Sequence, residues 1–178
     1  VAAKDSMPLL TQSISADGNT LIAMTSAGDA NIHRVDLATG AVQPLLTSQF
    51  FERWAMLSPN GRYLAYTCNE SGRPEVYVRE LSPTGGKWQV SSGRGRMPQW
   101  RADGKELYYL RFEGDMLAVP VSYDGGLNIG QPTVLFNRPS YFDGTASHTP
   151  YQVSRDGQEF MMVTTESQTG TAEVVVVQ

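Results

Sequence analysis

The sequence predicts an all-β protein: a β-propeller, or a propeller segment, of four antiparallel four-stranded blades. An Asp-Gly or Asn-Gly turn occurs four times, and each turn leads into a short β-prone run. The turn glycines are 43 residues apart from Gly18 to Gly61 and again from Gly61 to Gly104, and the last step, to Gly157, is 53. A period of about 40–45 residues is typical of propeller blades. The four turns are Asp17-Gly18, Asn60-Gly61, Asp103-Gly104 and Asp156-Gly157.

The second turn shows why this pattern predicts two strands joined tightly. Asn60-Gly61 is a strong hairpin signal because both residues accept positive φ at little cost. Pro59 fixes φ and cannot donate a ladder hydrogen bond, so it marks the end of the incoming strand. The run 63–66 that follows is short and β-prone, as expected of a strand buried on both faces. We expect the turn acids to bond the turn backbone and to be structural.

The chain is expected to form one propeller segment over 1–178, with blades at about 7–47, 48–91, 92–137 and 145–178. Strands a to d run from the axis outward, and no segment shows helical periodicity of useful length. The predicted strands are 9–15, 20–25, 30–37 and 41–47; 53–58, 63–68, 75–81 and 87–91; 97–101, 106–112, 116–121 and about 133–136; and 148–154, 159–164 and 172–177.

The fourth blade lacks its outer strand, which leaves the apolar run 174–177 at an edge. Such an edge invites pairing with another chain, so self-association is expected to be possible. Propellers usually have more than four blades. We therefore expect part of a longer propeller; the alternative is a chain that closes a ring with its own N-terminus or with a second copy.

Composition excludes several functional classes. The formal net charge of −4 over 178 residues argues against nucleic-acid binding. No apolar run approaches the roughly 20 residues that a membrane span needs. The single cysteine, Cys68, lies in a predicted strand and is expected to be a small core residue. No Cys/His cluster or calcium loop occurs, so no metal or cofactor is expected.

The unit Ser58-Pro59-Asn60-Gly61 with its following strand resembles the TolB-type propeller repeat, a WD-repeat-like family with the pattern Ser-Pro-Asp-Gly. The other three repeats depart from it at the proline, where they have Ala16, Ala102 and Arg155. The resemblance implies a bacterial periplasmic or other extracytoplasmic location, with a cytoplasmic one left open.

A longer succession, roughly 59–163, is similar to the C-terminal propeller region of bacterial serine/threonine protein kinases and of membrane-linked transcriptional regulators. It includes Asn-Glu-Ser-Gly-Arg-Pro-Glu-Val-Tyr-Val at 69–78 and Gln-Trp-Arg-Ala-Asp-Gly at 99–104. In those proteins the propeller is a non-catalytic sensing or interaction module. The kinase motifs themselves are absent from this chain. The resemblance therefore implies a module of a larger protein whose catalytic domain lies elsewhere.

The chain is not expected to be an enzyme. The serine-hydrolase motif Gly-x-Ser-x-Gly does not occur, and His33 is expected to be an ordinary strand residue. The carboxylates that a glycosidase would need are better explained as solvated loop charges; they are Glu52, Glu70, Glu113, Asp115 and Asp143. The alternative left open is a propeller hydrolase or lyase with a site near the axis that involves His148.

A protein or peptide partner, or a small ligand, is expected on the face that carries the d–a and b–c loops. Exposed aromatic residues beside arginines are typical of interface anchors. Two other interpretations stay open: Phe50 or Phe51 fills a gap between blades, and the arginines are simply solvated. Trp54, Trp88 and Trp100 are expected in the core between blades. The candidate binding residues are Phe50, Phe51, Arg53, Arg73, Arg94, Arg96, Tyr141, Phe142 and His148.

Overall fold

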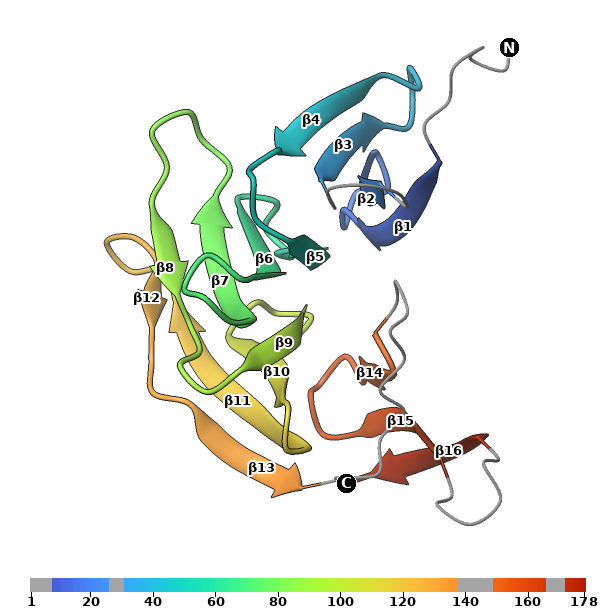
Figure 1. Cartoon of the computed structure of the whole chain (residues 1–178), viewed down its shortest axis with the longest axis vertical. Coiled ribbons are helices and arrows are strands. Elements are labelled where there is room, and N and C mark those ends of the chain that lie inside the picture. The colour runs from blue at the N-terminus through green and yellow to red at the C-terminus, as the bar shows by residue number, and fades with distance from the viewer. Residues whose placement is uncertain (1–7, 26–30, 138–148, 166–171) are drawn as a thin grey trace.

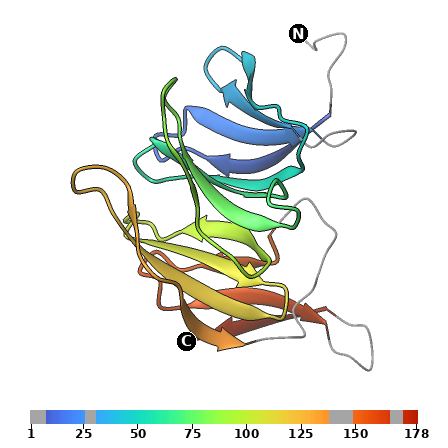
Figure 2. The ribbon, with the colours of Figure 1, turned by 60° about the vertical axis from the view of Figure 1, so that its left-hand side comes forward.

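The computed structural model describes residues 8–25, 31–137, 149–165 and 172–178, and the regular elements of this part of the chain are all strands. Four antiparallel sheets follow one another as the four blades of a β-propeller. In Figure 1 the blades follow an arc from the blue N-terminal sheet through green and yellow to the red one, and Figure 2 shows them from the side. The predicted fold class is confirmed.

Blades one and two have the expected four strands each, in the order a to d from the axis outward. Blade one consists of β1 (Leu9–Ile14), β2 (Thr20–Thr25), β3 (Ile32–Asp36) and β4 (Val42–Leu46). Blade two consists of β5 (Glu52–Leu57), β6 (Tyr63–Cys68), β7 (Glu75–Glu80) and β8 (Lys87–Gln89). Cys68 is buried and has a free thiol, as predicted.

Blades three and four differ from that plan at their outer edges. Blade three consists of β9 (Gly95–Trp100), β10 (Glu106–Arg111), β11 (Asp115–Ser122) and an outer edge in two pieces, β12 (Asn128–Ile129) and β13 (Thr133–Asn137). Both pieces pair with β11, and Pro132 lies between them. The single predicted outer strand was therefore incomplete. Blade four consists of β14 (Tyr151–Val153), β15 (Phe160–Thr165) and β16 (Ala172–Val177).

The four repeated turns are built by their own side chains. In blade two the Ser58 hydroxyl donates to Asn60 Oδ1 (2.8 Å) and accepts the amide of Tyr63 (2.9 Å). The Arg62 amide donates to Asn60 Oδ1 at 3.0 Å. The same three bonds recur in blades one and four, and Arg101 replaces the serine in blade three. In all four turns the side chain of the Asp or Asn thus accepts a backbone amide of its own turn.

The expected turn conformation was wrong in one respect. All four turn glycines have positive φ, between 70° and 78°, but no turn Asp or Asn does. The amide of Gly61 donates to the Ser58 carbonyl, and the amide of Ser58 donates to the Tyr63 carbonyl (2.8 Å each), so these are longer loops than a two-residue hairpin. Only the glycine needs the left-handed region, in which a side chain is costly.

Each junction between neighbouring blades holds one apolar core. Ile22, Leu64 and Tyr66 belong to the core between blades one and two. Tyr63, Trp100 and Leu107 belong to the core between blades two and three. Tyr108, Tyr151 and Phe160 belong to the core between blades three and four. Trp54, Trp88 and Trp100 each lie in or against one of these cores, as predicted.

Hydrogen bonds also join the inner strands of neighbouring blades. Ser13 Oγ donates to the Ala55 carbonyl (3.1 Å) and accepts the amide of Leu57 (3.0 Å). Two repeats later, the buried Gln99 amide donates to the Tyr151 carbonyl at 2.6 Å. These bonds fix the blades relative to one another, and with them the loops at the strand ends.

Candidate partner-binding face

Loops from different strands meet at one end of blades two and three. We call this end the loop-rich face and define it by residues 47–53, 69–75, 91–96 and 111–115. The Phe51 amide donates to Asn69 Oδ1 (2.9 Å), and Arg73 Nη2 donates to the Ser92 carbonyl (2.7 Å). Each bond joins a loop between blades to a b–c loop. The expectation that these two kinds of loop share a face is thus confirmed for blade two.

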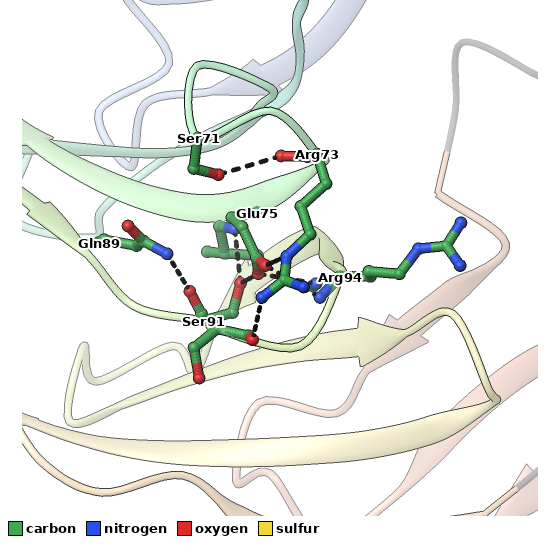
Figure 3. Close-up of polar contacts among 9 residues, drawn as sticks. Ser71, Arg73, Glu75, Gln89, Ser91 and Arg94 are labelled. Carbon is green, nitrogen blue, oxygen red and sulfur yellow. Dashed lines mark hydrogen bonds and ion pairs between the residues drawn. The ribbon is translucent and has the colours of Figure 1, made fainter.

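Glu75 anchors the loop that carries the predicted arginines (Figure 3). Its side chain is fully buried at the start of β7. Oε1 accepts Arg73 Nε (2.8 Å) and the Arg94 amide (3.1 Å), while Oε2 accepts the Ser91 hydroxyl and the Gly95 amide (3.2 Å). Burial acts to raise the pKa of this carboxyl, but these donors outweigh it and leave the pKa lowered. Glu75 therefore remains ionised and fixes the backbone at 91–95.

The anchored loop presents Arg94 and Arg96 to one aromatic ring. Their guanidinium carbons lie 4.0 Å and 4.9 Å from the ring centroid of Phe112, which is 47% exposed. Arg94 is exposed, and in Figure 3 its side chain points away from the bonds around Glu75. Arg96 is only 8% exposed, so for Arg96 the interpretation as a solvated arginine was wrong. Stacking on the face of an aromatic ring is a favourable interaction for an arginine guanidinium group.

A shallow depression of about 330 Å³ lies beside this stack. Arg73, Arg94 and Arg111 supply its positive charge, and Glu113 and Asp115 supply acidic groups. Arg73 is paired with Glu75, and Arg111 lies 3.4 Å from Asp115. Of the three arginines that line this depression, Arg94 is the one for which the described residues supply no ion pair, so it is the most available to a partner.

Phe51, Arg53 and Trp54 form a second cation–aromatic group on the inner strand of blade two. The Arg53 guanidinium lies 4.2 Å from the Phe51 ring centroid, and the Phe51 and Trp54 rings meet edge to face at 6.2 Å. Burial lowers the pKa of Arg53, whose Nε is buried without a hydrogen-bond partner in the described part of the chain. This arginine is half-buried rather than solvated.

A repeated backbone feature lies directly after both inner-strand arginines. Trp54 and Met97, which follow Arg53 and Arg96, have φ of 52° and 56°. The pairing register shifts in the same part of β5 and β9. A bulge of this kind re-aims neighbouring side chains, and positive φ at a bulky residue costs about 1–3 kcal/mol.

Other predicted candidates have different places. Phe50 packs against the core between blades one and two, in agreement with the interpretation that it fills a gap between blades. Arg73 holds the loop through Glu75 and Ser92. Tyr141, Phe142 and His148 lie outside the described residues, as does Asp143. The alternative enzyme site that involves His148 therefore stays a prediction.

Sequence reasoning missed Phe112 and Glu75. Phe112 had been placed at the end of a strand, but β10 ends at Arg111 and Phe112 begins the b–c loop. Its position directly after a β-prone run was the available signal. Glu75 carries no sequence signal of its own, because its donors come from segments up to 20 residues away.

Two of the groups expected to be non-catalytic, His33 and Glu52, are buried in strands; for Glu52 the expectation of a solvated loop charge was wrong, because it begins β5 and is 4% exposed. His33 is 7% exposed in β3, and burial lowers the pKa of its imidazole. Burial likewise raises the pKa of the Glu52 carboxyl, which accepts the Ser48 hydroxyl at 3.0 Å. Within the described ranges, no group of three or more His, Cys, Asp or Glu side chains is placed to hold a metal ion. That part of the chain also contains no helix long and apolar enough to cross a membrane.

The four antiparallel blades and their repeated turns place the chain in the β-propeller class. No family model matches the chain. A TolB homolog of Chlorobium luteolum is 30% identical over 125 residues, which is 70% of this chain and 29% of the relative. The chain is thus a β-propeller that is similar in sequence to this TolB homolog, and it spans less than a third of that relative's length.

Solved structures share the fold at low sequence identity. TolB from Acinetobacter baumannii superposes with a TM-score of 0.69 at 20% identity, over 96% of this chain and 41% of that one. A puromycin-hydrolysing peptidase of Mycobacterium tuberculosis gives a TM-score of 0.63 at 19% identity, over 93% of this chain and 29% of that one. Because the fold occurs in an enzyme as well, the fold alone does not assign a function.

Proposed function

We propose that this chain is a non-catalytic binding module that takes a protein or peptide partner on the loop-rich face. The observation that carries the proposal is Arg94, exposed and stacked on Phe112 while Glu75 fixes its backbone. A rigidly held arginine beside an exposed aromatic ring has the composition of an interface hot spot. The likeness to TolB homologs, whose fold this chain shares, is consistent with a binding or scaffold role.

We also propose that the module belongs to a larger, extracytoplasmic bacterial protein, in which it acts as a sensor or scaffold. The TolB-like repeats support the location. The similarity of 59–163 to kinase-linked propellers supports a link to a catalytic domain elsewhere. The relative and the two solved structures described above are not kinases. The proposed link to a kinase domain therefore rests on the similarity of 59–163 to kinase-linked propellers.

Self-association is the third part of the proposal, and blade four supports it. Met161 and Val176 are paired across β15 and β16, as are Val163 and Val174. Met161, Val174 and Val176 are 49%, 64% and 56% exposed, so one face of this blade carries several apolar side chains. A sheet face of this kind is typical of an interaction surface.

The test of partner binding begins with a peptide selected from a random phage-displayed library against the folded chain. We expect Arg94→Ala and Phe112→Ala each to weaken its binding about tenfold or more, since truncating a hot spot costs at least about 1.4 kcal/mol. Circular dichroism should show both variants folded, because both side chains are exposed.

Arg62→Ala is the matched control. Arg62 is also an exposed arginine over an aromatic ring, 5.5 Å from the Tyr63 centroid, but it lies at the a–b turn of blade two. Its truncation should leave the affinity unchanged. If Arg62→Ala weakens binding as much as Arg94→Ala, or if Arg94→Ala has no effect, the assignment to the loop-rich face is wrong.

A further inference from the structure

A groove lies between the a–b turns of blades one and two, at the opposite strand ends from the loop-rich face. It encloses about 380 Å³. We call it the blade 1–2 groove and define it by an apolar floor and a polar rim. The floor is Ile22, Leu57 and Leu81, and the rim is Asp17, Arg34 and Asn60.

The rim offers groups of both charges above an apolar surface. Arg34 is exposed, and its guanidinium donates to the Thr20 hydroxyl at 3.2 Å. The Ser15 hydroxyl and the Asn19 amide donate to Asp17 and hold the pKa of its carboxyl below the usual value, so Asp17 stays ionised. An apolar floor with a few placed polar groups is the usual make-up of a binding pocket, and this volume is at the small end of the range.

The junction between blades two and three is filled at the corresponding place. Trp100 stands where blade two has Leu57, 43 residues earlier, and its indole Nε1 donates to the Met56 carbonyl at 3.1 Å. Tyr123 stacks on Tyr63 at 5.5 Å, and its hydroxyl donates to the Gly104 carbonyl at 3.0 Å. Two aromatic side chains thus close this junction, each with its polar atom bonded.

The junction between blades three and four is also filled. Tyr108 stands where blade one has Ile22, two repeats earlier, and its ring meets Phe160 edge to face at 5.1 Å. A Cβ built on Gly157 would lie 2.2 Å from the Tyr108 hydroxyl, whereas nothing lies within 4 Å of one built on Gly61. The same repeat position is therefore closed by a tyrosine in one junction and open in the blade 1–2 groove.

We infer that the blade 1–2 groove binds the side chain of a tyrosine presented by a partner polypeptide. The ring lies on the partly exposed Leu57 and Leu81, close to the fully buried Ile22, and the hydroxyl meets the rim, where Arg34 donates and Asp17 accepts. The chain itself supplies the precedent, since tyrosine and tryptophan fill the equivalent space at the two other junctions. Aromatic side chains with one polar end suit sites that are apolar below and wet above. The inference does not depend on the proposed function of the loop-rich face.

The test is a methyl NMR titration with N-acetyltyrosinamide, with N-acetylalaninamide as the control probe. A fragment of this size binds weakly, with a Kd of about millimolar. We expect saturable shifts of the Ile22, Leu57 and Leu81 methyl signals with the tyrosine probe only. Absence of such shifts, or equal shifts with the alanine probe, overturns the inference.

Two variants sharpen the test. Leu57→Trp places the blade-three residue in the floor and should abolish the shift of Ile22, whereas an unchanged titration contradicts the inference. If that variant fails to fold, Arg34→Ala on the exposed rim should weaken binding of the tyrosine probe about threefold or more. Arg62→Ala, whose arginine is not among the groove residues, should leave it unchanged; equal effects of Arg34→Ala and Arg62→Ala contradict the assignment.

Discussion

Replacing Glu75 should loosen the arginine-bearing loop and destabilise the fold. The carboxylate is fully buried and accepts four hydrogen bonds, two of them from the backbone amides of Arg94 and Gly95. Glu75→Ala removes every acceptor at once. Glu75→Gln keeps the shape but turns one oxygen into an NH₂ group, which must face at least one of these donors.

The magnitude follows from the groups left without partners. A buried donor that loses its acceptor costs about 1–3 kcal/mol. Removing one partner of a buried ionic cluster costs about 3–5 kcal/mol. We therefore expect Glu75→Ala to lower the free energy of unfolding by about 3 kcal/mol or more, and Glu75→Gln by about 1–2 kcal/mol.

The assay is urea unfolding followed by circular dichroism, with Glu80→Gln as the control. Glu80 lies at the other end of β7 and is paired with Arg62 at 3.2 Å, but both side chains are partly exposed. An exposed pair contributes at most about 1 kcal/mol, so the control should change little. Equal destabilisation by Glu75→Gln and Glu80→Gln would refute the argument that the buried acceptor anchors the loop.

Three further predictions concern the turns and the last blade. Ala102→Pro should raise the free energy of unfolding by about 0.5 kcal/mol and so raise the urea midpoint. Pro59 holds the same position in a turn whose glycine has nearly the same φ, 70° against 73°. A lower midpoint would contradict the equivalence of the two turns. The Arg101 side chain lowers the pKa of Asp103 to about 2 from 3.8. Its stabilisation is therefore present above about pH 4 and is lost as pH falls toward 2, so Asp103→Asn should differ from the parent at pH 5 and converge with it at pH 2; an equal difference at both pH values would exclude this coupling. Met161→Lys should abolish any concentration-dependent mass seen by light scattering, since Met161 lies on the exposed apolar face of blade four; a persisting dimer would exclude that face.

Much of the fold could be predicted from the sequence because its signals are local. The strand Tyr63–Cys68 begins and ends as predicted, since a turn with Pro59 and Gly61 precedes it and a polar loop follows it. The regular spacing of the turns then assigned each strand its place in a blade. The bulges at Trp54 and Met97 could not be predicted in this way, because bulky residues rarely adopt positive φ and nothing in the local pattern marks these two positions.

The candidate site was only partly predictable. The sequence put Arg94 on a loop between blades, as the structure does, with Tyr141 and Phe142 expected on the neighbouring blade. Those two residues lie outside the described part of the chain, so that expectation stays a prediction. In the described residues the partner is Phe112, and the anchor is Glu75. Both contacts join segments of different strands, so they depend on how the strands pair and not on local pattern.

Hydrogen exchange of the chain with and without the selected peptide tests the central claim most directly, because it maps the bound face without any substitution. The account predicts slowed exchange of backbone amides within 92–96 and 111–115, with amides of the a–b turn at 58–61 unchanged. Protection confined to the a–b turns, with 92–96 exchanging at its free rate, would contradict the assignment of partner binding to the loop-rich face.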